Sequence, residues 1–286
     1  MAADDGIATA GAQSVRRALA VLRIVAAGQE QGVRLVDVAH ATGLNRPTVH
    51  RILRVLVEEG AAEQDPATRR YLIGREVSLM GLARSARPPV QAAAEPHLRA
   101  LAETEGETCF LTIRNGDDSV CLVRQPGSYP IKVLSIAVGA RRPLGAGVSG
   151  LVLLGALPPA DAAAIVLRNA PRLQALGIAP DQLLQRAAAA AAHGYAYAAV
   201  GVVPGSRAVA VPVRASDGRV LAGLAVAAIT ERLPDDRVQP LAACLAALAT
   251  QIGAETHEAA ARSSLKRRYG GGSREQSDDG PAISGL

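Results

Sequence analysis

The segment from Asn45 to Gly60 constrains the fold more than any other part of this 286-residue chain. Its apolar residues recur at i, i+3, i+4 and i+7, which is the spacing of one face of an α-helix. Asn45 is a good N-cap, and Pro47 suits the first helical turn. The apolar face consists of Val49, Ile52, Leu53 and Leu56, and the opposite face carries Arg46, His50, Arg51 and Arg54. The pattern predicts a helix that packs through one stripe and presents a basic stripe.

The flanking segments decide between two interpretations of this helix. A basic amphipathic helix can simply lie on a protein surface with its charges in water. Here a helix predicted over 14–27, with Ser14 as its N-cap, precedes a turn and a short helix from Leu35 that Gly43 stops. After Gly60, short strands near 61–64 and 69–73 flank a turn at Asp65. This order of helix, helix, turn, helix and hairpin is typical of a winged helix-turn-helix.

A helix of this kind suits the major groove of double-stranded DNA, because guanidinium groups bind guanine edges and phosphates. Its N-terminus also favours a nearby phosphate. An arginine-bearing wing can contact phosphate or the minor groove beside the helix. The predicted DNA-binding residues are Asn45, Arg46, Thr48, His50, Arg51 and Arg54 on the helix, with Arg69 and Arg70 on the wing.

The rest of the chain predicts a second domain, consistent with a length of 286 residues at roughly 100–200 residues per domain. Periodicity and turn signals predict helices over 75–86, 90–104, 147–157, 160–168, 180–192 and 234–262, and strands over 108–114, 119–124, 131–137, 195–200, 207–214 and 219–229. The expected class is α+β. Its parts are a winged head at 14–74, a linker helix at 75–89, a body at 90–262, and disordered tails at 1–13 and 270–286.

Composition excludes several other kinds of protein. The net charge of +5 fits a polyanionic partner, but a coding bias toward alanine and arginine is the favoured explanation of the arginine content. With no Trp and only Phe110 as phenylalanine, a stacking platform for single-stranded nucleic acid is not expected. Three scattered cysteines favour neither a disulfide framework nor a zinc site. Without a signal peptide or a long apolar run, we expect a soluble cytoplasmic protein and no membrane partner.

No catalytic set is found in the body. Gly145, Gly147 and Gly150 match the spacing of a dinucleotide-binding loop. That loop needs a preceding apolar strand and an acidic residue about 20 positions later, and neither is present. His257 and Glu258 begin like a zinc-protease helix, but no second histidine follows at the required spacing. We therefore expect no enzyme activity, metal or cofactor, although the helix N-terminus after the glycine loop suits an anion.

Several segments together resemble the IclR-type transcriptional regulators, over about residues 14–257. They are Ser14–Leu22, Leu44–Leu53 with the core Thr48–Arg51, Gly60, Asp65–Gly74 with its end Tyr71–Gly74, Gly106–Thr108, Gly139, Pro143–Leu144, His193–Tyr195, Val209–Pro212 and Gly218. The resemblance implies a winged head joined to a GAF-like effector-binding domain, here 90–262. It also implies homodimers or dimers of dimers, and a small-molecule effector that is often an organic acid or an aromatic compound.

The same resemblance implies where the effector binds. The corresponding positions are Ile131, Leu134, Arg142, Val148, Ser149, Ala198, Ser206, Ala208, Ala225 and Ala227. Members that bind very small keto acids use polar residues where this chain has Ala198, Ala208, Ala225 and Ala227. We therefore expect a larger and less polar acid than glyoxylate or pyruvate. Arg142 either pairs with the carboxylate of that acid or is a surface residue beside Arg141.

These expectations describe a ligand-responsive regulator that binds a DNA operator. Two alternatives stay open from the sequence. One is an architectural DNA-binding protein without an effector, and the other is an enzyme that uses the body domain. A ligand that binds saturably and also changes operator affinity would distinguish the regulator from both.

Overall fold

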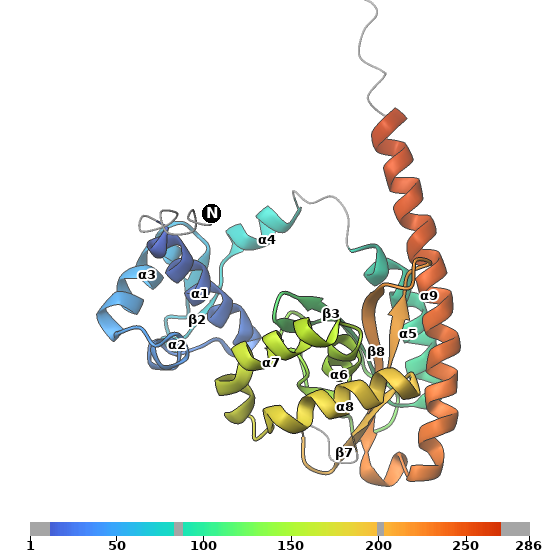
Figure 1. Ribbon diagram of the computed structural model, residues 1–286. Helices are drawn as coiled ribbons and strands as arrows, with labels where there is room; N and C mark the ends of the chain where they lie inside the picture. The colour runs from blue at the N-terminus through green and yellow to red at the C-terminus, as the bar shows by residue number, and fades with distance from the viewer. Residues whose placement is uncertain (1–11, 83–87, 199–202, 270–286) are drawn as a thin grey trace, which may run out of the picture.

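The computed structural model describes residues 12–82, 88–198 and 203–269, with side chains up to residue 259. It contains a small head and a larger α+β body. The helix α4 (Arg75–Leu82) follows the head and leads toward the body (Figure 1). The head contains α1 (Gln13–Ala27), a short 3₁₀ helix (Gln29–Gln31), α2 (Leu35–Thr42), α3 (Arg46–Glu58), β1 (Ala62–Gln64) and β2 (Tyr71–Ile73). The fold class is therefore α+β with an N-terminal winged helix-turn-helix, as predicted.

The sequence explains where α2 ends and α3 begins. Gly43 follows α2 with φ +68°, a left-handed conformation that glycine adopts without steric cost. The side chain of Asn45 accepts a hydrogen bond of 2.9 Å from the backbone N–H of Thr48, which caps α3. The tight turn between these two residues fixes the angle at which α3 leaves α2.

The head has its own core, in which α3 is held by Val49 and Leu53. Both side chains are fully buried, together with Val21, Val25 and Val38 from the other two helices. Tyr71 from the wing closes this core, and its backbone pairs with Val33. Because one stripe of α3 supplies the core contacts, its opposite stripe is left to solvent.

The body is built on one antiparallel sheet between two layers of helices. After the linker helix α4 (Arg75–Leu82), the body elements are α5 (Pro89–Glu105), β3 (Thr108–Asn115), β4 (Asp118–Gln125), β5 (Arg141–Pro143), α6 (Gly147–Gly155), α7 (Pro159–Gln174), α8 (Pro180–His193), β6 (Ala196–Ala198), β7 (Ser206–Arg214), β8 (Val220–Ile229), a 3₁₀ helix (Thr230–Arg232) and α9 (Asp235–Tyr269). The six strands lie in the order β5-β4-β3-β8-β7-β6. In Figure 1, α5 and the long α9 lie side by side along one edge of the body.

Strand alternation divides the core between the two faces of this sheet. Leu224 and Val226 of β8 pack with α5 and α9, whereas Ala225 and Ala227 point to the side of α6, α7 and α8. Gly223 allows α6 to approach closely, because a Cβ atom there would lie 3.2 Å from the carbonyl oxygen of Ser149. Farther along the same face of β8, the small side chains of Ala225 and Ala227 leave space between the sheet and the helices.

Several sequence-based boundaries differ from the structure. The α1 helix starts at Gln13, so Ser14 lies inside its first turn and not at the N-cap. Residues 131–137 form no strand, because residues 139–143 pair with the free edge of β4 instead. The α7 helix continues past 168 to Gln174, and α9 continues past 262 to Tyr269. Gln13 lies in α1 although it was predicted within the tail at 1–13. Residues 1–11 of that tail, residues 83–87 of the linker predicted over 75–89, and the whole tail predicted at 270–286 lie outside the described residues.

No helix within the described parts of the chain is both long and apolar enough to cross a membrane.

Candidate DNA-binding surface and effector cavity

The outward face of α3 carries the predicted basic stripe. Asn45, Arg46, His50, Arg51 and Arg54 are all exposed, and Thr48 is half-buried in the first turn. Arg54 lies 3.4 Å from the carboxylate of Glu58 one turn later, which holds it along the helix surface. Arg46, His50 and Arg51 therefore project from the N-terminal half of α3, the part that reaches base edges in helix-turn-helix proteins.

The two wing arginines differ in what they contact. Arg69 is exposed and has φ +57°, at the end of the turn that Asp65 organises. The backbone N–H groups of Thr68 and Ala67 donate to the carboxylate of Asp65, and these bonds lower its pKa. Arg70 is half-buried and donates to the carbonyl oxygen of Gly32 at 3.1 Å. Arg70 thus ties the wing to the turn before α2, and Arg69 is the wing residue that is directed outward.

A cavity of about 420 Å³ lies between the sheet and α6. Its volume falls within the range of about 300–1,000 Å³ that is typical of small-molecule sites. The lining is mainly small or apolar, with a few polar side chains. It comprises Phe110, Thr112, Ser119, Val133, Ser135, Ile136, Arg142, Ala146–Gly150, Leu176–Ile178, Arg186, Ala198, Ser206, Ala208, Ala225 and Ala227.

Eight of the ten positions predicted for the effector line this cavity, from Arg142 and Val148 to Ala225 and Ala227. Ile131 and Leu134 do not, since they expose 58% and 49% of their surface. The segment that carries them turns Val133, Ser135 and Ile136 inward instead. These two residues lie outside the cavity because the segment is not a strand, so its inward residues could not be deduced from strand alternation.

The prediction also omitted lining residues on other elements. Phe110 and Thr112 alternate with Cys109 and Leu111 along β3, and the period of two places the first pair on the cavity side. That signal was available from the sequence. Arg186 is an exposed residue of α8, and no sequence pattern distinguishes it from other surface arginines.

Arg142 faces the cavity, whereas Arg141, which is also half-buried, pairs with Asp118. Its guanidinium donates to the carbonyl oxygen of Ser135, on the segment that closes one side of the cavity. Burial lowers the pKa of Arg142, and no carboxylate among the described residues pairs with it. A half-buried cation without a counter-charge is an electrostatic site for an anion.

The N-terminus of α6 opens into the same cavity. The first helical turn at Gly147–Ser149 has no side-chain cap, and N–H groups at this end of a helix lack intrahelical acceptors. Gly145 has φ +97°, and a Cβ atom on Gly150 would lie 2.9 Å from the backbone nitrogen of Gly145. The glycine spacing that resembles a dinucleotide-binding loop is therefore required for this turn and its packing.

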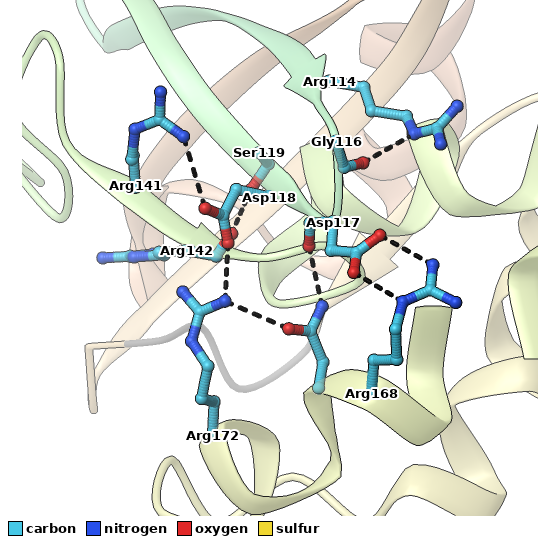
Figure 2. A network of polar contacts seen from close by, with 10 residues as sticks. Arg114, Gly116, Asp117, Asp118, Ser119, Arg141, Arg142, Arg168 and Arg172 are labelled. Carbon is cyan, nitrogen blue, oxygen red and sulfur yellow. Dashed lines mark hydrogen bonds and ion pairs between the residues drawn. The ribbon is translucent and has the colours of Figure 1, made fainter. Parts of the chain in front are cut away.

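A polar network fixes the β3–β4 turn to α7 and β5 beside the cavity (Figure 2). Arg168 binds the carboxylate of Asp117 through two bonds of 2.7 and 2.9 Å and lowers its pKa. Asp118 pairs with Arg172 at 2.7 Å and with Arg141 at 3.3 Å. The next residues along both strands, Ser119 and Arg142, line the cavity. The network thus holds the strands that position the cavity arginine.

No group of three or more His, Cys, Asp or Glu side chains within the described residues is placed to hold a metal ion. Burial raises the pKa of Cys121 to about 11 and that of Cys109 to about 12, which makes both thiols weak nucleophiles. The body contains a cavity lined by Arg142, by the N–H groups at the start of α6 and by small apolar side chains.

The winged head and the separate α+β domain define a DNA-binding transcriptional regulator. Residues 14–66 match the family described as the IclR helix-turn-helix domain, and residues 85–254 match the bacterial transcriptional regulator IclR C-terminal domain. The chain belongs to the IclR family of transcriptional regulators.

Individual relatives agree with this assignment. The transcriptional regulator BhcR of Paracoccus denitrificans is 31% identical over 238 residues, which are 81% of this chain and 82% of BhcR. A crystal structure of an IclR regulator from Silicibacter sp. TM1040 is 28% identical, with a TM-score of 0.65, and the match covers 84% of this chain and 96% of that one. The fold also matches an IclR homologue from Microbacterium hydrocarbonoxydans complexed with 4-hydroxybenzoate, at 22% identity, TM-score 0.63 and coverage of 86% and 100%. BhcR and the Silicibacter protein are both named as transcriptional regulators, in agreement with the family matches.

Proposed function

We propose that this protein is a ligand-responsive regulator that binds a DNA operator through α3 and an organic acid in the body cavity. The observation that carries this proposal is Arg142, a half-buried cation that faces the cavity without a carboxylate partner among the described residues. An architectural DNA-binding protein would have no need of such a group. The acid would place its carboxylate between Arg142 and the N–H groups at the start of α6.

The remainder of the lining indicates what the acid looks like. Ala198, Ala208, Ala225 and Ala227 line the cavity, and Phe110 adds a buried aromatic face. Small apolar residues leave volume and favour burial of hydrocarbon surface. We therefore propose an acid with an aromatic or branched skeleton, larger and less polar than glyoxylate or pyruvate. The fold is compatible with such a ligand, since the Microbacterium homologue was solved with 4-hydroxybenzoate.

We propose that the operator is read by a homodimer, alone or within a dimer of dimers. Exposed apolar side chains on two helices support this assembly, because they would be covered in it. Val15 and Leu19 of α1 expose 59% and 46% of their surface, and Met80 and Leu82 of α4 expose 63% and 75%. A two-fold dimer would read two half-sites of a roughly palindromic operator.

We propose that ligand binding in the cavity affects the position of the head through residues 75–104 and through one direct contact. The Gln29 side chain, in the turn before α2, donates to the carbonyl oxygen of Val138 at 2.5 Å. Val138 lies between the cavity residues Ile136 and Arg142. A ligand that binds one arrangement of these residues more tightly than another would change the spacing of the two heads in a dimer.

Arg142→Ala should weaken binding of carboxylic acids about 10- to 100-fold, as expected for loss of a hydrogen-bonded charge pair. Isothermal titration calorimetry of a panel of aromatic and branched acids measures this directly. Arg99→Ala is the matched control, because Arg99 is an exposed arginine on α5, on the other side of the sheet. Equal affinity of the Arg142 variant and the wild type for every acid that binds would remove Arg142 from the site.

A further inference from the structure

Two arginines line the effector cavity from different elements of the body. Arg142 reaches it from β5, beside the first turn of α6. Arg186 reaches it from α8, and Leu176 and Gly177 line it from the segment between α7 and α8. Arg142 is half-buried, whereas Arg186, Leu176 and Gly177 are exposed. Arg142 therefore lies within the cavity, and Arg186 lies at its open side.

The charge of these two arginines is not balanced by the protein. No aspartate or glutamate is among the described residues that line the cavity, and neither arginine forms an ion pair with a described residue. The other arginines beside the cavity each have a carboxylate partner, since Arg141, Arg168 and Arg172 pair with Asp117 or Asp118 (Figure 2). Arg142 and Arg186 are thus the arginines that line the cavity without a carboxylate partner among the described residues.

Apolar surface is the main feature of the rest of the lining. Phe110, Ala225 and Ala227 cover the sheet side, and Val148 and Ile178 lie on the helical side. A ligand that satisfies both cations and this lining carries an anionic group at each end of a hydrocarbon skeleton. A monoacid would leave one arginine to solvent.

We propose that the cavity selects diacids, with one carboxylate on Arg142 and the second on Arg186 at the open side. This inference rests on the proposed function, and it narrows the effector from an organic acid to a dianion. Arg186 is then a specificity residue that distinguishes diacids from monoacids of the same skeleton. Because the Arg186 end is solvent-exposed, its pairing is weaker than that of a buried group, and the expected preference is about fivefold.

The experiment compares monoacids with diacids of the same skeleton, namely benzoate with terephthalate and hexanoate with adipate. Isothermal titration calorimetry of the full chain gives each dissociation constant at low and high salt. For at least one pair, the diacid should bind wild type about fivefold more tightly, and this preference should shrink in high salt because exposed charges are screened. Arg186→Gln should abolish the preference and leave the monoacid affinity within twofold. Arg99→Gln removes the same charge from an exposed site across the sheet and should change neither affinity.

Several results would overturn the inference. In one, monoacids bind but neither diacid binds more tightly than its monoacid. That result would contradict the diacid preference and would still agree with the proposed function. Another is an equal loss of affinity for monoacid and diacid in Arg186→Gln, because a general change of the cavity would weaken the binding of both acids. Binding of none of the four acids would contradict the inference together with the proposed acid effector. Both variants should unfold at the same temperature as the wild type, which checks that folded proteins are compared.

Discussion

Replacing Leu53 with alanine should unfold the head at temperatures where the body remains folded, and operator binding should be lost. Leu53 is fully buried in the head core, where it packs with Val49, Val21 and Tyr71. A Leu→Ala change at a buried site costs about 2–5 kcal/mol. A head of about 60 residues has a free energy of unfolding of roughly 3–9 kcal/mol at typical stability per residue. The substitution therefore removes a large part of the stability of the head.

Thermal unfolding by circular dichroism and an operator gel-shift series measure both effects in the full chain. Val55→Ala is the control, because Val55 lies on the same helix but exposes 45% of its surface. That variant should unfold within a degree or two of the wild type. A Leu53 variant with wild-type unfolding and wild-type DNA affinity would show that α3 is not packed through this stripe.

Arg51→Ala should reduce operator affinity by about 1–3 kcal/mol if its guanidinium binds a base edge. Arg51 is exposed on the outward face of α3, one turn after the capped N-terminus, and no ion pair with a described residue restrains it. Arg54 is paired with Glu58, so its loss should have a smaller effect. Gel-shift titrations against the operator and against unrelated DNA give the two affinities.

The salt dependence of the same titrations distinguishes the two kinds of contact. An arginine that contacts a base loses affinity mainly for the operator, whereas one that contacts only phosphate loses affinity for all sequences and gives a shallower salt slope. Arg23→Ala, an exposed arginine of α1 in the same head, controls for the loss of one positive charge. Wild-type binding of the Arg51 variant to both DNAs would exclude both roles.

The head could be predicted almost completely from the sequence because its signals are local. The cap at Asn45, the glycine after α2 and the apolar spacing of Val49 and Leu53 each act within a few residues. The body strands with clear turns, such as β7 and β8 around Gly218, were predicted for the same reason.

The cavity wall at 131–137 could not be predicted in this way. Its apolar residues look like a strand, but whether they form one depends on a partner edge, and β4 pairs with residues 139–143. Ile131 and Leu134 are therefore outside the cavity, and Val133 and Ile136 are inside it. Arg186 was missed for a related reason, since only the tertiary arrangement brings α8 to the cavity.

The most direct test of the regulator is whether acid binding and operator binding are linked. The operator is the DNA segment that the protein protects in cells, and its dissociation constant is measured with and without a saturating acid identified by calorimetry. We expect the acid to change the operator dissociation constant about 5- to 150-fold, and the operator to change the acid affinity by the same factor, because linkage is reciprocal. Acid binding that leaves the operator affinity unchanged, with Arg142 and the cavity intact, would contradict this expectation.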